Sequence, residues 1–275
     1  MDSNIANELG SRFHPVVFLR TDTKPENAMQ PRAGMKSGCV MPYFAQAAVK
    51  GRTAVFDRDT FLCAGASSGL CFGRAYDRWL PGGIDTFAAF FSHGLASAKD
   101  PELYEKVISF MPEKRQEMFR TGECMHYSQE IARKFIEEQM PNYDLPEKYA
   151  VYKPLAELKD GEVPLSVIFT VNPVQMSALM HLAGALPDGN GMACTSRASA
   201  CQAIGSEAVR QGEKDVPNAV LGLTDLAGRL HSRNLIPNEY LTYAVPWKMF
   251  LAMDASAKEN SIFQSHVWKE LNKSN

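Results

Sequence analysis

The chain has 275 residues, of which 45% are hydrophobic and 22% are charged, so it can bury a sizeable core without disulfide bonds. Its 29 basic and 31 acidic residues leave a net charge of −2 at pH 7. Binding to nucleic acid or to an anionic membrane surface needs concentrated positive charge, whereas Lys and Arg are scattered among acidic residues here. Neither is therefore expected as a partner.

Targeting signals are not apparent in the sequence. The N-terminal segment is polar and lacks the basic stretch and apolar run of a secretory signal peptide. No segment approaches about 18 consecutive apolar residues, as a membrane-spanning helix would require. We therefore expect a cytoplasmic protein. In that reducing compartment, its six cysteines should be free thiols that are buried, bind a metal or react.

The first elements of the chain are expected to alternate between strands and helices. Short runs of β-branched and aromatic residues indicate the strands, and a glycine at position 51 is a typical helix C-cap. In chain order we predict a strand over 14–22, a loop over 23–38, a helix over 39–51, a strand over 52–61 and a small-residue helix over 63–75.

The next region is mainly helical. Residues 77–85 are typical of a turn, and residues 87–140 have a helical pattern with breaks at Pro101 and Pro112. The segment that follows predicts a loop, a strand, a turn and a second strand. That second strand, 166–171, is a continuous apolar run and is expected to be central and buried on both faces.

Asn172 and Pro173 predict the start of a helix, as its N-cap and its first residue. This helix is expected over 173–186, and the turn residues 187–191 end it. A further helix is predicted over 193–211.

The C-terminal residues 243–271 predict a short strand, a helix and a final amphipathic segment. The sequence contains no internal repeat, no low-complexity tract and no polar linker long enough to mark a domain boundary. Strands and helices alternate along it. We therefore predict a single domain over 1–275, of the α/β or α+β class, with a mixed β-sheet and flanking helices.

The cysteines do not form a recognisable metal motif, because no CxxC spacing occurs. Cys63 and Cys71 lie eight residues apart, and Cys194 and Cys201 lie seven apart, so each pair would share one face of a helix. Cys39 begins a predicted helix, where backbone N–H groups favour a thiolate. For any single cysteine, packing in the core as a small apolar side chain is the favoured alternative.

Two further features are candidates for ligand binding. Gly65, Gly69 and Gly73 recur every four residues, which allows close approach either by a ligand or, as we favour, by another backbone. Asn172 and Gln175 follow a strand at a helix start, where α/β proteins often bind ligands. Simple N-capping is the favoured explanation of Asn172.

Several stretches of the sequence together resemble a known protein family. They are "PVVFLRTDTKPENA", "GCVMPYFAQAAVKGRTAVFDRDTFLCAGASSGLCFG", "VIFTVNPVQMSALMHLAG", "ACTSRASACQAIG" and "AVPWKMF". With these stretches the chain resembles, over roughly residues 10–270, the family catalogued as domain of unknown function 169. The resemblance implies a soluble prokaryotic protein, frequent in anaerobes and archaea, with no settled activity.

The resemblance also implies a cysteine set. Positions that match the family pattern are Cys39, Cys63 and Cys201. Many members carry a fourth cysteine where this chain has Leu223 and Asp225. Three cysteine ligands would therefore remain for a bound iron–sulfur cluster. The fourth ligand would be Asp225, Cys194 or Cys71. Alternatively, one iron would have no protein ligand.

Three hypotheses follow. In the first, Cys39, Cys63 and Cys201 bind an iron–sulfur cluster, [4Fe–4S] above all, with a redox or Lewis-acid role. In the second, the chain is a metal-free small-molecule binder or non-redox enzyme, with a pocket between 63–73 and the helix starting at Pro173. In the third, Cys39 or Cys63 is a reactive redox-sensing thiol. The expected partner is a small molecule or a redox protein.

Overall fold

The computed structural model describes residues 1–32, 38–59, 63–97, 100–186, 193–195, 199–258 and 261–272. These residues form a seven-stranded sheet in the order β2-β3-β1-β4-β7-β6-β5. Its strands are β1 (Val16–Thr21), β2 (Ala54–Asp57), β3 (Tyr149–Pro154), β4 (Ser166–Val171), β5 (Ala193–Thr195), β6 (Ala219–Gly222) and β7 (Leu241–Pro246). Neighbouring strands are antiparallel except for the parallel pair β5 and β6. The sequence-based expectation of a mixed sheet with flanking helices is confirmed.

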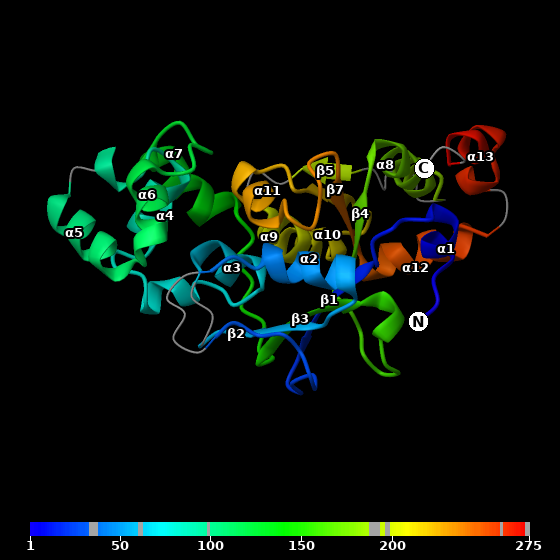
Figure 1. Cartoon of the computed structure of the whole chain (residues 1–275), viewed down its shortest axis with the longest axis horizontal. Helices are drawn as coiled ribbons and strands as arrows, with labels where there is room; N and C mark the ends of the chain where they lie inside the picture. The colour runs from blue at the N-terminus through cyan, green and yellow to red at the C-terminus, as the bar shows by residue number, and fades with distance from the viewer. Residues whose placement is uncertain are drawn as a thin grey trace.

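Helices cover both faces of the sheet and form a separate lobe at one end of the molecule (Figure 1). The helices against the sheet are α1 (Asn4–Leu9), α2 (Met41–Lys50), α3 (Ala64–Gly69), α8 (Pro173–Gly184), α9 (Ala200–Gln202), α10 (Ala208–Gly212), α11 (Leu226–Ser232), α12 (Trp247–Ser256) and α13 (His266–Asn272). The lobe contains α4 (Ile84–Phe91), α5 (Pro101–Phe110), α6 (Glu113–Thr121) and α7 (Gln129–Lys134). No helix in the described ranges has the length and apolar character that crossing a membrane requires.

Alternate residues of each strand belong to different cores, as the period of two of a strand requires. On β1, Val16 and Phe18 belong to the core that contains residues of α2, α3 and α10. Val17 and Leu19 belong to the core beneath α1, α8 and α12. A third core, with Phe87 at its centre, lies inside the helical lobe. The candidate site lies between the first of these cores and the third.

Most elements predicted around strong local signals are confirmed. Strand β1 lies within 14–22, and α2 ends at Gly51, whose φ of 63° is the left-handed C-cap conformation. Strand β4 covers the predicted apolar run and is buried along its whole length. Helix α8 begins at Pro173 behind an Asn172 cap. These elements are fixed by residues within a few positions of their ends, which is why sequence reasoning finds them.

The predicted helix over 193–211 is wrong at its start. Residues Ala193–Thr195 form β5, which pairs in parallel with β6. The helical part begins at Ala200 and continues through a π-helical turn, Ala203–Glu207, into α10. Strand pairing at the sheet edge outweighs the helical propensity of this small-residue stretch, and local pattern does not report such pairing.

The predicted helix over 63–75 is also shorter than expected. Helix α3 ends at Gly69, and Cys71 has a φ of 59°, which lies in the left-handed region. Arg20 of β1 holds this turn, because its Nη1 atom donates to the carbonyl oxygens of Leu70 at 2.8 Å and Cys71 at 2.6 Å. The buried guanidinium thereby fixes the end of α3 to the sheet.

Helix α3 packs directly on the segment that follows α9. A Cβ atom added at Gly69 would lie 2.7 Å from the carbonyl oxygen of Cys201, and one added at Gly205 would lie 1.8 Å from the carbonyl oxygen of Gly69. Only glycine fits at both positions, and Gly205 lies within the π-helical turn. This backbone-to-backbone contact sets the distance between Cys201 and the helix that Cys63 caps.

Candidate functional site

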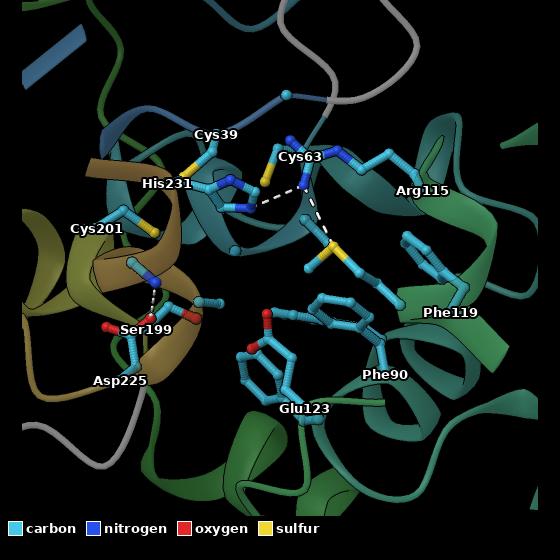
Figure 2. Close-up of a pocket in the computed structure, with 18 of the residues that line it drawn as sticks. Cys39, Cys63, Phe90, Arg115, Phe119, Glu123, Ser199, Cys201, Asp225 and His231 are labelled. Atoms are coloured by element: carbon cyan, nitrogen blue, oxygen red, sulfur yellow. Dashed lines mark hydrogen bonds between the residues drawn. The ribbon is translucent and has the colours of Figure 1, made fainter. Parts of the chain in front are cut away.

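A pocket of about 780 Å³ of empty space, part of it open to solvent, separates the sheet from the helical lobe. Its sheet-side wall comes from the starts of α2, α3, α9 and α11, and its lobe-side wall comes from α4 and α6. Figure 2 shows polar and sulfur-bearing side chains on the first wall and aromatic side chains on the second.

Three thiols line the sheet side of this pocket. Cys39 lies just before α2, Cys63 is the N-cap residue of α3, and Cys201 lies in α9. In Figure 2 their sulfur atoms are directed toward the same space around the His231 ring. Cys39 and Cys63 are half-buried, and Cys201 is buried. Three segments far apart in the sequence therefore bring thiols to one wall.

The environment of these thiols favours their neutral form in the absence of a bound cation. Burial raises the pKa of Cys39 to about 12, with a further contribution from nearby Cys63. Burial likewise raises the pKa of Cys63, and it raises the pKa of Cys201 well above its ordinary value, with Cys63 and Cys39 adding to the effect. Hydrogen bonds from backbone N–H groups lower these pKa values: the N–H of Met41 acts on Cys39 and that of Ala66 acts on Cys63.

Two carboxyl groups also face the pocket. Asp225 is the N-cap of α11, where its Oδ2 atom accepts a hydrogen bond of 2.7 Å from the backbone N–H of Gly228, while its Oδ1 atom is buried without a partner in the described part of the chain. Burial raises the pKa of Asp225. Glu123 follows α6 and also has an unpartnered buried oxygen, Oε2. Burial raises the pKa of Glu123 to about 7, and the nearby negative charge of Asp225 makes the second-largest contribution to this rise.

Arg115 of α6 reaches across the pocket to His231 of α11 (Figure 2). The distance from Arg115 Nη1 to His231 Nε2 is 2.8 Å. A guanidinium only donates hydrogen bonds, so Nε2 accepts and the ring proton of a neutral His231 lies on Nδ1. Burial lowers the pKa of His231, and the charge of Arg115 lowers it further. The imidazole is thus kept neutral and ties the helical lobe to α11.

The lobe side of the pocket is apolar and largely aromatic. Phe87, Phe90 and Phe91 come from α4, Phe119 comes from α6, and Trp79 precedes them in the chain. Phe90 and Phe119 pack with their ring centroids 4.8 Å apart. The indole Nε1 atom of Trp79 is buried without a hydrogen-bond partner among the described residues. The pocket therefore joins a polar, thiol-bearing wall to an aromatic chamber.

The predicted ligand-binding residues are not brought together. Gly65 lines the pocket, and Cys201 Sγ lies 3.8 Å from where its Cβ would be, whereas Gly69 is covered by the backbone of Cys201. Asn172 and Gln175 form a reciprocal capping box at the start of α8, with Gln175 N donating to Asn172 Oδ1 at 2.9 Å. They lie with the core on the opposite face of the sheet.

The pocket expected between 63–73 and the helix starting at Pro173 is therefore corrected. The sheet separates the two segments, since α3 belongs to one core and α8 to the other. Pro173 instead borders a separate hollow with Trp268 of α13. The face of the sheet that each segment covers is decided by sheet topology, which local sequence patterns do not report.

The expected cysteine pairs are also corrected. Cys71 lies past the end of α3, buried in the sheet core beside Arg20, and is not among the residues that line the pocket. Cys194 lies in β5, so it shares no helix with Cys201, and its side chain is outside the described part of the structure. Of the candidate fourth ligands, only Asp225 is shown at the pocket.

Residues 65–69, with sequence GASSG, match the letters of the GxSxG motif of serine hydrolases. Ser67, however, lies inside α3, and its hydroxyl donates to the carbonyl oxygen of Cys63 at 2.9 Å. The motif needs a serine exposed on a sharp turn from strand to helix. Ser67 is buried and its hydroxyl is hydrogen-bonded within the first turn of the helix, so it is not exposed as a nucleophile.

Sequence reasoning did not single out Arg115, Glu123 or His231 as site residues. Arg115 belongs to α6, a charged helix without fully buried residues, which has the appearance of a solvated surface helix. Glu123 and His231 have no local motif. In the described ranges, no group of three or more His, Cys, Asp and Glu side chains is arranged to hold a metal ion. These residues become a site only because the lobe packs over α11.

Fold and pocket together define a mixed α/β protein with a thiol-lined cleft between its sheet and a helical lobe. The chain belongs to the family of domain of unknown function 169, whose model, described as "Uncharacterised ArCR", matches residues 4–255. The resemblance expected from the sequence is thereby confirmed over nearly the whole chain. Neither the curated proteins nor the solved structures contained a match.

The raised pKa of Glu123 predicts a pH-dependent stability. The folded carboxyl keeps its proton up to a pKa of about 7, whereas the unfolded one loses it near 4.5. The folded state thus binds more protons between these values, and stability falls as pH rises through this window. For metal-free protein, Glu123→Gln removes this loss. Its free energy of unfolding relative to wild type should rise by about 2 kcal/mol from pH 4.5 to pH 8.

Urea unfolding at several pH values measures this difference. Glu117→Gln, on the exposed side of the neighbouring helix α6, is the matched control, because the side chain of Glu117 is 73% exposed. A Glu123→Gln difference that stays constant across the pH range would show that the carboxyl is not held protonated in the folded protein.

Proposed function

We propose that this chain is an iron–sulfur protein in which Cys39, Cys63 and Cys201 hold a [4Fe–4S] cluster. The observation that carries the proposal is the convergence of these thiols, from three separate segments, on one wall of one pocket. In a chain kept in a reducing cytoplasm, thiols gathered in this way serve metal binding better than they serve simple core packing. Cys71 shows the contrast, because it is buried but does not line the pocket.

The chemistry of the donor set suits a cluster. Thiolates are the usual ligands of iron–sulfur clusters, and hydrogen bonds to the sulfurs together with burial tune their potentials. Backbone N–H groups of Met41 and Ala66 act on the sulfurs of Cys39 and Cys63, as such a site needs. Each thiolate of a cluster binds its own iron, so its ligands are spaced more widely than those of a single ion.

Three thiolates would leave one iron of the cluster without a cysteine. Asp225 would be the fourth ligand, because it lines the pocket and its Oδ1 atom has no hydrogen-bond partner among the described residues. When bound, a cluster of this kind supplies a centre for electron transfer or, at an iron without a thiolate, a Lewis acid. The chain's own part is to hold the sulfurs, shield them from water and bind a small molecule or redox partner beside them.

Anaerobic expression followed by iron and acid-labile sulfide analysis tests the proposal. The expected result is a brown protein with about four iron and four sulfide per chain and a broad absorbance that bleaches on reduction. Chelation under air should remove the colour and leave the thiols free. A colourless protein with sub-stoichiometric iron, before and after anaerobic reconstitution with iron and sulfide, would exclude the cluster.

A metal-free small-molecule binder is the second candidate. The aromatic chamber favours it, because Phe90, Phe119 and Trp79 form a ligand-sized apolar wall with few polar groups. This candidate expects ligand binding in protein that carries no iron. The two candidates differ in the role of the thiols, since only the first requires Cys39, Cys63 and Cys201 together.

A further inference from the structure

Arg115 carries a positive charge into the pocket. Its guanidinium donates to the neutral His231 ring at 2.8 Å and contacts the sulfur of Met118 at 3.4 Å. No carboxylate of the described residues forms an ion pair with it. Arg115 also acts electrostatically on the carboxyl of Glu123, whose pKa it lowers against the effect of burial. A partly desolvated cation gains most from a directly bonded counter-ion, so an anion that forms hydrogen bonds with Arg115 would be stabilised in this pocket.

The geometry around Arg115 specifies where such an anion would lie. The side chain enters from α6, and its head lies between the thiol wall and the rings of Phe90 and Phe119 (Figure 2). His231 and Met118 both contact Nη1, and no described residue forms a hydrogen bond with Nε or Nη2, which leaves these donors for a planar, two-oxygen group. A carboxylate matches that fork with two parallel hydrogen bonds.

The rest of the pocket favours a ligand whose remaining part, away from the carboxylate, is apolar. Beyond Arg115, the wall consists of Phe87, Phe90, Phe91 and Phe119, together with Trp79. Rings of this kind pack well against another ring or an alkyl chain.

We propose that the pocket binds a small organic carboxylate with an apolar, ring-sized body, its carboxylate on Arg115 and its body among the lobe's aromatic side chains. The inference deepens the proposed function. It rests on that function in one respect, namely that the acid is the substrate of a site that carries a cluster. The carboxylate end would lie on Arg115, beside the thiol wall that would hold the cluster. Binding itself needs only the chain.

Titration calorimetry with 4-phenylbutyrate and with 4-phenylbutanol tests the proposal, on protein as purified anaerobically and after removal of iron. The two probes share the apolar body and differ in charge. We expect the acid to bind at least about tenfold more tightly than the alcohol, as a charge-assisted bidentate pair predicts. Equal affinity for both probes, or no binding of the acid in either preparation, would overturn the proposal.

Variants separate the two halves of the site. Arg115→Met should weaken the acid at least about tenfold and leave the alcohol unchanged, whereas Phe119→Ala should weaken both probes. Retained alcohol binding shows that the Arg115→Met variant is folded. Arg120→Met is the matched control, because Arg120 lies on the same helix but bonds to Tyr104 and Gln116 outside the pocket. An Arg115→Met variant that binds the acid as wild type does would refute the proposed contact.

Failure of this inference and failure of the proposed function give different results. Arg115-dependent binding of the acid by a chain that never takes up iron would leave the inference standing and remove the cluster. A protein with full iron and sulfide whose acid affinity is unaffected by Arg115→Met would keep the cluster and remove the inference.

Discussion

Cys63→Ala is expected to abolish cluster binding, with iron and sulfide content falling by at least about tenfold, because even the loss of a supporting residue costs a metal site roughly 10–100-fold in affinity. Cys63 is the N-cap of α3 and lines the pocket together with Gly65 of the same helix. Removing its sulfur would leave a second iron of the cluster without a cysteine. Cys39→Ala and Cys201→Ala are expected to have the same effect, because the three thiols act as one unit.

Two other cysteines of the chain provide matched controls. Cys124 is exposed and does not line the pocket, and Cys71 is buried in the sheet core away from it. Cys124→Ala and Cys71→Ala should retain wild-type iron and sulfide, measured by the same assay after anaerobic purification. Equal iron in the Cys39, Cys63 and Cys201 variants and in wild type would contradict the ligand assignment. So would an equal loss in the two controls.

Gly205→Ala is expected to destabilise the protein by about 3 kcal/mol and to lower cluster occupancy with it. The new Cβ atom would lie 1.8 Å from the carbonyl oxygen of Gly69, a distance that a backbone contact cannot accommodate. Because the clash is with backbone, α3 must move away from the segment after α9. That movement separates Cys63 from Cys201, which the Gly69–Gly205 contact holds in place.

Urea unfolding and iron analysis measure the two effects of Gly205→Ala. Gly184→Ala is the control, because Gly184 also lies in a helix but has no neighbouring atom within 4 Å of an added Cβ. It should leave stability unchanged or raise it by up to about 1 kcal/mol, as alanine favours a helix over glycine. A Gly205→Ala variant as stable as wild type would mean that the two helices can separate without cost.

The elements that sequence reasoning located have local causes. The apolar run of β4 and the Asn172–Pro173 start of α8 are each specified by residues within a few positions. Strand β5 was missed because its conformation comes from pairing with β6, 26 residues later in the chain at Ala193 and Ala219. Helix α3 ends early because Arg20, from a distant strand, binds the carbonyl groups of the following turn.

The sequence by itself determined the chemical inventory of this protein: free cysteines without a local metal motif, glycines that permit close backbone contact, and a family resemblance that singled out Cys39, Cys63 and Cys201. Only the tertiary structure decided that these thiols share a wall with Asp225 and face the charge of Arg115. The physical reason lies in the range of the forces. Hydrophobic periodicity specifies which face of a helix is buried, but the partner of that face is chosen by long-range packing.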